Sequence, residues 1–185
     1  MDKIETPANA RLRDKIGWLC HVLRLTAAAY ALWVLIEIAR FWSTPARVAR
    51  HWSDWLHVGV TEPWPGQLAL GFTLHFAIWL LVAAACYSVW RLFSGYLEGR
   101  IFTADAAVWL RRAGTYGLAA QFSDMLTRPI VSMIVTAHMQ TGDRLVSVSL
   151  SQPDLLNILF LTGFIALAHI FGAAAKLAEE HAQIV

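Results

Sequence analysis

The sequence has 185 residues, of which 57% are hydrophobic and only 15% are charged. A soluble domain carries about a quarter charged residues, so the composition excludes an ordinary soluble globular protein. The formal net charge of +2 is too small for a typical nucleic-acid-binding protein, and we expect no direct contact with nucleic acid.

The apolar residues gather into four runs, each long enough to cross a membrane. The runs cover residues 16–42, 67–93, 113–137 and 155–177. A helix needs about 20 residues to cross a hydrocarbon core of about 30 Å, and barrel strands would be about half as long. The sequence therefore predicts an all-α integral membrane protein, a bundle of four transmembrane helices.

The distribution of Lys and Arg predicts the orientation of this bundle, because both are retained on the cytoplasmic side in short loops. Nine of them fall on the side of the two chain ends and four on the other side. Tryptophans also mark two interfaces, with Trp18, Trp90 and Trp109 at one and Trp42, Trp52, Trp55 and Trp64 at the other. Both chain ends are therefore expected in the cytoplasm, with the protein multi-pass in the bacterial inner membrane.

The four runs and this orientation divide the chain into nine segments. These are a cytoplasmic tail (1–15), four spans (16–42, 67–93, 113–137 and 155–177), two periplasmic connections (43–66 and 138–154), a cytoplasmic elbow (94–112) and a second cytoplasmic tail (178–185).

The first periplasmic connection, 43–66, contains apolar residues at three- and four-residue spacing. Val48, Trp52 and Leu56 recur among Arg and His, a pattern that predicts a short helix lying in the membrane interface. Pro63 and Pro65 are expected to end this helix and turn the chain into the second span.

The cytoplasmic elbow has clear helix signals. Thr103 is a good N-cap with Asp105 in the first turn, so a helix is expected to start there and continue into the third span. Gly95 and Gly99 precede it and predict a flexible turn.

The second periplasmic connection shows strand-like alternation over residues 146–150, compatible with a small hairpin. Ser151 and Asp154 follow, three residues apart. They resemble a capping pair that opens the fourth helix.

Four ionisable residues fall within the spans: Arg24, Glu37, Asp124 and Arg128. Asp124 and Arg128 are four residues apart in the favoured acid-first order for an intrahelical pair. By depth, Arg24 is expected to reach Asp124 and Arg128 to lean toward Glu37, which predicts a charged seam between the first and third spans. These charges either fix helix register, form a proton or substrate path, or reach toward the headgroups.

Four histidines raise the question of haem, since imidazole is a common haem ligand in helical bundles. His21 and His169 share the inner half of the predicted bundle, and His75 and His138 share the outer half. Because each span offers one histidine and no haem-attachment motif is present, we expect no cofactor.

No catalytic triad, metal-ligand spacing, Gly-rich phosphate loop or pair of catalytic carboxylates occurs in the sequence, so a non-enzymatic protein is expected. Cys20 and Cys86 lie in apolar runs and are expected to fill space in the core.

Residues 96–103 (YLEGRIFT), 110–114 (LRRAG) and the ending 176–185 (KLAEEHAQIV) resemble the signature of DUF2975, an uncharacterised family of bacterial four-helix membrane proteins. In some bacteria genes of this family sit beside a small helix-turn-helix regulator. The resemblance implies that the cytoplasmic face could hold such a regulator at the membrane. The partner-binding residues expected from it are Tyr96, Gly99, Phe102, Thr103, Glu179 and Glu180.

The leading hypothesis is thus a lipid-embedded protein that binds another protein, either this regulator or a larger membrane complex. Two alternatives stay open. One is a small transporter or proton-coupled carrier that uses Asp124 and Arg128, and the other is a haem-binding membrane protein.

Overall fold

A computed structural model describes residues 7–100, 103–137, 139 and 150–183, with side chains described over 17–100, 103–137, 139 and 150–177. The regular structure in these ranges is helical, as expected. The helices are α1 (Pro7–Trp42), α2 (Pro45–Leu56), α3 (Pro65–Leu97), α4 (Ala104–Thr136) and α5 (Gln152–Gln183). The predicted hairpin over 146–150 falls largely outside the described residues.

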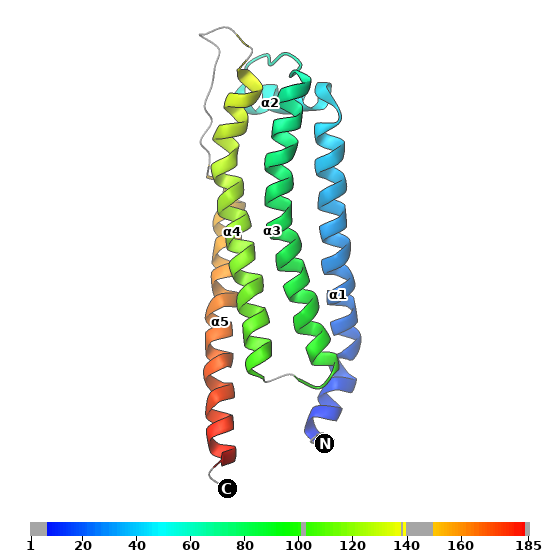
Figure 1. Cartoon of the computed structure of the whole chain (residues 1–185), viewed down its shortest axis with the longest axis vertical. Coiled ribbons are helices and arrows are strands. Elements are labelled where there is room, and N and C mark those ends of the chain that lie inside the picture. The colour runs from blue at the N-terminus through cyan, green and yellow to red at the C-terminus, as the bar shows by residue number, and fades with distance from the viewer. Residues whose placement is uncertain (1–6, 101–102, 138, 140–149, 184–185) are drawn as a thin grey trace.

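The four long helices lie in a row in the order α1, α3, α4, α5 (Figure 1). α3 packs against both α1 and α4, and α4 packs against α5. Within the described part of the chain, α1 and α5 do not form a packed pair. The row is therefore open along one side, between its first and last helices.

Among the residues that the structure describes, three helices are long and apolar enough to cross a membrane: Gly17–Trp42, Pro65–Leu97 and Gln152–Leu177. α4 differs because it carries Asp124 and Arg128 together with charges in its first turns. Where side chains are described, it is also the helix with the most buried residues, since α3 and α5 cover it on two sides. The chain is thus a membrane protein by the length and composition of its helices.

The expected short helix in the first connection is present as α2. Pro45 stands at its first turn, where a missing N–H costs nothing. The helix ends at Leu56 and is followed by His57, whose φ of 55° is left-handed. The prediction that the prolines end this helix is wrong, since α2 ends at Leu56, before either proline. The predicted turn into the next long helix is confirmed, because Pro65 begins α3.

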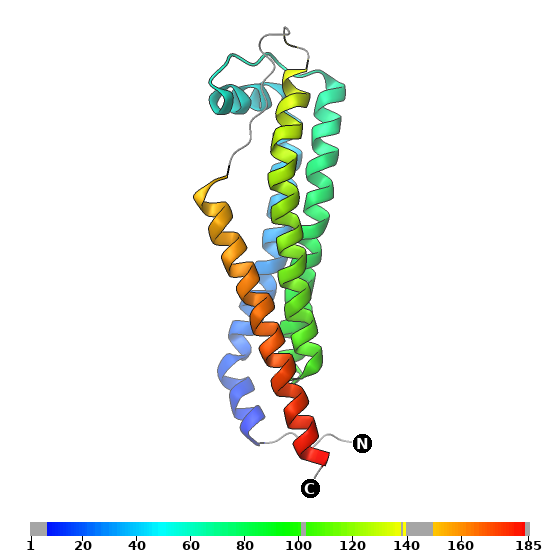
Figure 2. The ribbon, with the colours of Figure 1, turned by 90° about the vertical axis from the view of Figure 1, so that its left-hand side faces the viewer.

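α2 buries one face against the end of the helix row. Val48 and Trp52 join Trp42, Val131 and Val135 in a hydrophobic core. The Trp42 ring lies directly over Gly71 of α3, where a Cβ would come within 2.1 Å of it. α2 lies at the end of the molecule opposite the α3–α4 turn and extends to one side of the long helices (Figure 2).

The α3–α4 turn is shorter than the predicted elbow, because residues 94–97 and 104–112 are helical. Gly99 has a φ of 80°, and the N–H groups of Gly99 and Arg100 donate to the carbonyls of Tyr96 and Gly95. These bonds form the standard glycine-terminated helix end. The other predicted hinge, Gly95, is wrong because this residue lies buried within α3. Thr103 is confirmed as the N-cap of α4, since its Oγ1 accepts from Ala106 N at 3.2 Å.

α1 begins and α5 ends at the same end of the molecule (Figure 1). α5 also starts part-way along α4, because its third residue, Asp154, lies opposite Arg128. Eight further residues of α4 follow Arg128, which is about 12 Å of helix.

Candidate functional site

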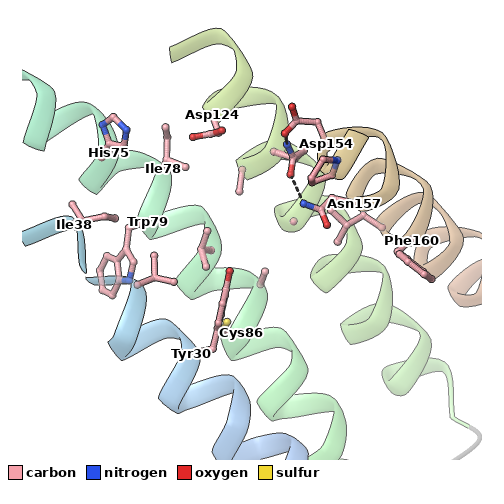
Figure 3. Close-up of a pocket in the computed structure, with 18 of the residues that line it drawn as sticks. Tyr30, Ile38, His75, Ile78, Trp79, Cys86, Asp124, Asp154, Asn157 and Phe160 are labelled. Atoms are coloured by element: carbon pink, nitrogen blue, oxygen red, sulfur yellow. Dashed lines mark hydrogen bonds between the residues drawn. The ribbon is translucent and has the colours of Figure 1, made fainter. Parts of the chain in front are cut away.

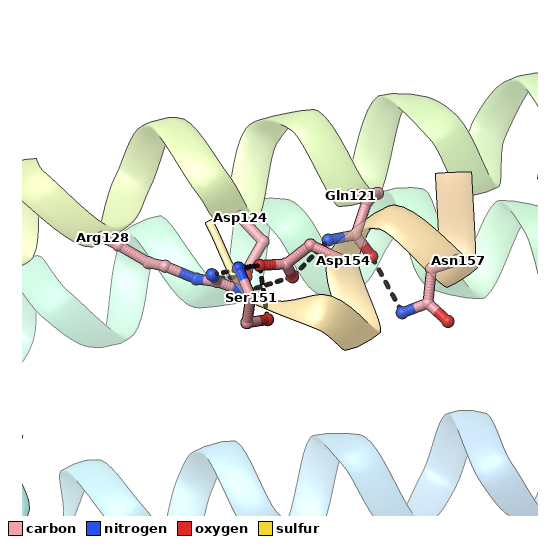
Figure 4. A network of polar contacts seen from close by, with 6 residues as sticks. All are labelled: Gln121, Asp124, Arg128, Ser151, Asp154 and Asn157. Carbon is pink, nitrogen blue, oxygen red and sulfur yellow. Dashed lines mark hydrogen bonds and ion pairs between the residues drawn. The ribbon is translucent and has the colours of Figure 1, made fainter. Parts of the chain in front are cut away.

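A charged network joins the middle of α4 to the start of α5 (Figure 4). The Arg128 guanidinium donates to both oxygens of Asp154, from Nη1 to Oδ2 at 2.7 Å and from Nη2 to Oδ1 at 2.8 Å. Its Nε donates to Asp124 Oδ2 at 3.0 Å. The predicted intrahelical pair of Asp124 and Arg128 is therefore confirmed, and Arg128 bridges two carboxylates on two helices.

The capping pair predicted at the start of α5 is also confirmed. Asp154 Oδ2 accepts from the backbone N–H of Ser151 at 2.9 Å and from its hydroxyl at 2.7 Å. Gln121 of α4 donates to Asp154 Oδ1 at 2.9 Å and accepts from the amide of Asn157 at 3.1 Å. Asp154 is thus satisfied on both oxygens, and its side chain is only 4% exposed.

Glycines on α4 let α5 approach closely enough to make these contacts. A Cβ at Gly114 would come within 2.7 Å of Ile165 Cγ1, and one at Gly117 within 2.5 Å of Leu161 Cδ2. Small residues allow such close approach between helices in membranes. The α4–α5 contact therefore depends on glycine at positions 114 and 117 as well as on the charged network.

The network forms one wall of a cavity of about 720 Å³ among α1, α3, α4 and α5 (Figure 3). The opposite wall is aromatic and apolar, with Tyr30 and Ile38 from α1 and His75 and Trp79 from α3. Phe160 of α5 adds a further ring. Among the described residues α1 and α5, which both line the cavity, do not pack together, so the described part of the chain leaves the cavity open between them.

The aromatic wall is held in place by hydrogen bonds to the backbone. Trp79 Nε1 donates to the carbonyl of Ala31 in α1 at 2.8 Å, and the ring stacks on Phe76. His75 Nδ1 lies 3.0 Å from the carbonyl of Gly71, one turn earlier in α3.

The charged seam predicted between the first and third spans is wrong in its location. α1 packs against α3, and the Arg24 guanidinium lies over the Trp90 ring of α3 at 4.2 Å instead of reaching Asp124. Glu37 pairs with Arg40 of its own helix at 3.4 Å, on an exposed surface. The seam instead lies between α4 and α5, since Arg128 turns to Asp154.

The structure tests one of the two conceivable haem-ligand pairs, His21 with His169, and does not bring its members together. His21 is on α1 and His169 on α5, two helices that do not pack against each other among the described residues. His169 Nδ1 contacts the Ile165 carbonyl of its own helix at 2.8 Å. His138, the expected partner of His75, lies outside the described residues. The described residues contain no group of three or more His, Cys, Asp or Glu that could hold a metal ion.

The structure describes some of the predicted partner-binding residues and not others. Gly99 forms the end of α3, Thr103 caps α4, and Tyr96 packs edge-on against Phe93. Each therefore has a local structural role. Phe102 and the side chains of Glu179 and Glu180 lie outside what the structure describes.

Sequence reasoning missed Asp154 as a member of the charged network. It identified Asp154 only as a cap, because it counted this residue in the outer connection and not in a span. Because α5 begins beside the middle of α4, the cap residue Asp154 at its first turn lies within reach of Arg128. Gln121 was missed because an uncharged amide in an apolar run gives no comparable signal.

The family described as "Protein of unknown function (DUF2975)" has a sequence model that matches residues 26–185. No curated protein and no solved structure matches the chain.

Proposed function

The chain belongs to the DUF2975 family, and we propose its role from its own geometry. It is a non-enzymatic protein of the bacterial inner membrane, with four spans and both ends in the cytoplasm. There it binds another protein, either a small helix-turn-helix regulator or a larger membrane complex.

α4 serves as the fourth span in this proposal although it is less apolar than the others. A charged side chain in a membrane is tolerated when it is paired and faces the protein interior. Arg128 meets both conditions through Asp124 and Asp154. The exposed large apolar side chains of α1 and α5, such as Trp33 and Leu159, then face lipid.

One observation supports the proposal that a partner binds: α1 and α5 both extend past the α3–α4 turn. Gly17 lies beside Leu97 at the end of α3, yet α1 begins at Pro7. Gly172 lies beside Ala107 near the start of α4, yet α5 continues to Gln183. Helical segments this short are marginally stable in water by themselves, so a partner that packs on them would stabilise them.

Charge adds selectivity to these two extensions. The first carries Arg11, Arg13 and Lys15, and the second carries Glu179 and Glu180. They lie at the end that has the excess of Lys and Arg, the cytoplasmic end in this proposal. A partner with both acidic and basic patches would complement them.

Affinity purification of the full chain in mild detergent, with mass spectrometry of the co-purifying proteins, tests the proposal. The protein recovered is then purified and its binding measured against three forms of the chain. These are the full chain, a chain ending at Leu177, and the control Glu37→Gln, which changes an exposed carboxylate near the other end. We expect binding to be lost on truncation and kept by the control. Binding that is equal in all three would contradict the proposal.

Cysteine labelling tests the topology. In a chain without Cys20 and Cys86, a single cysteine at Ser53 in α2 should react with an impermeant thiol reagent added outside spheroplasts. A single cysteine at Glu98 in the α3–α4 turn should react only after the membrane is opened. The reverse pattern would overturn the orientation.

A second candidate function, a small carrier, is favoured by the position of Asp124 and Arg128 on the cavity wall. It predicts that purified protein in liposomes catalyses solute uptake and that Asp124→Asn abolishes it.

A further inference from the structure

The cavity has an unbalanced charge. Among the described residues that line it, three are Asp, Glu, Lys or Arg: Asp124, Arg128 and Asp154. Two carboxylates therefore face one guanidinium. An excess charge in a low-dielectric membrane interior is costly unless a counter-charge accompanies it.

The two carboxylates are not equivalent. Asp154 is almost completely buried, and its two oxygens accept hydrogen bonds from Arg128, Gln121 and Ser151. Asp124 is 37% exposed, and its contacts with Arg128 both use Oδ2. Asp154 is thus satisfied within the protein, whereas Asp124 has an oxygen to offer to the cavity, toward which Figure 3 shows it pointing.

The rest of the cavity suits an organic cation better than a hydrated metal ion. Tyr30, Trp79 and Phe160 present aromatic rings from three different helices. A cation is attracted to the face of an aromatic ring, and Trp gives the strongest attraction. The Trp79 ring is already fixed by its hydrogen bond to Ala31, so little ordering is needed when a ligand binds.

The size and opening of the cavity define the ligand further. Its volume of about 720 Å³ lies within the range of pockets that hold drug-sized molecules. It opens between α1 and α5, whose exposed surfaces are apolar. In the proposed topology this opening faces lipid, so a ligand that partitions into the membrane has direct access.

We propose that this cavity is a binding site for a lipophilic organic cation, with Asp124 as the counter-ion and Tyr30, Trp79 and Phe160 as the aromatic surround. The site is separate from the cytoplasmic extensions and does not depend on the binding of a protein partner. If the protein is instead a carrier, a lipophilic organic cation would be the class of solute that it carries. Binding of the cation without transport would support the site and contradict the carrier.

Binding of tetraphenylphosphonium to the purified full chain in detergent tests the proposal, measured by isothermal titration calorimetry. Triphenylphosphine oxide, a neutral molecule with similar rings, serves as the matched probe. We expect the cation to bind about tenfold or more tightly than the neutral probe, since only the cation gains from Asp124. Equal affinities would overturn the proposal, and this comparison needs no variant.

Variants then locate the site. Asp124→Asn should weaken cation binding about tenfold and leave binding of the neutral probe unchanged. Trp79→Leu should weaken cation binding by about three- to thirtyfold. The control Glu37→Gln, which lies outside the lining, should keep cation binding within about twofold of the native chain.

Two outcomes of these binding experiments would contradict the proposal. One is cation binding unaffected by Asp124→Asn in protein that keeps its melting temperature, which would place the cation elsewhere. The other is no cation binding to the native chain at pH 7.

Discussion

Arg128 and Asp154 join α4 to α5 through two hydrogen bonds at 2.7 and 2.8 Å, each to a different oxygen of the carboxylate. This bidentate arrangement is the strongest geometry available to an arginine and a carboxylate. It lies at the point where α5 begins, so the same carboxylate both caps one helix and holds its neighbour.

Loss of this carboxylate should destabilise the protein more than any surface change. Asp154→Ala leaves Arg128 with Asp124 alone and removes the cap, and removal of one member of a buried pair costs about 3–5 kcal/mol. Asp154→Asn should cost less, because an amide oxygen can still accept from Ser151. The measurement is the free energy of unfolding in mixed micelles titrated with SDS.

The control for this prediction is Glu37→Gln, which breaks an exposed ion pair with Arg40. Exposed pairs contribute about 0–1 kcal/mol, so this variant should unfold close to the native midpoint. If Asp154→Ala unfolded at the same SDS fraction as Glu37→Gln, the structural role of the network would be refuted.

Gly71→Ala should be destabilising although alanine is the better helix former. The new methyl would lie 2.1 Å from the rigid Trp42 ring, and overpacking of this kind costs about 1–3 kcal/mol. Gly163→Ala in α5 is the matched control, because nothing lies within 4 Å of its Cβ position. A thermal melt followed by size-exclusion chromatography should show a lower midpoint for the first variant and an equal or higher one for the second.

Gly99→Ala and Gly95→Ala should have opposite effects although they lie four residues apart. Gly99 has a φ of 80°, which costs an L-residue roughly 1–2 kcal/mol. Gly95 is helical with open space at its Cβ position, so alanine there should be neutral or stabilising by up to about 1 kcal/mol. The same SDS titration measures both, and a loss of stability in Gly95→Ala would contradict the assignment of the helix end.

The packing of α2 on the helix row can be tested at adjacent positions. Val48 is completely buried, and Val48→Ala should cost roughly 1–3 kcal/mol from lost methyl contacts. Arg47 is exposed on the same helix, so Arg47→Ala should change stability by less than about 0.5 kcal/mol. Equal effects, read from protease resistance of α2, would mean that α2 is not anchored on the core.

Local features were predictable from the sequence because their causes lie within one or two helical turns. Apolar runs predicted the long helices, Thr103 predicted the start of α4, and Ser151 with Asp154 predicted the start of α5. The four-residue spacing of Asp124 and Arg128 predicted their pairing.

Partners on different helices were not predictable in the same way. Depth alone placed Arg24 near Asp124, but depth does not say which helices are neighbours. α3 separates α1 from α4, and this order follows from which faces fit together. Arg24 therefore meets Trp90.

The sequence by itself determined where helices begin and end and that they belong in a membrane, because hydropathy and capping act along a single segment. The tertiary structure alone decided that α5 lies close against Gly114 and Gly117, so that Asp154 reaches Arg128. It also decided that the row stays open between α1 and α5, which creates the cavity. Such relationships depend on the shapes of two surfaces at once, and no single stretch of sequence contains both.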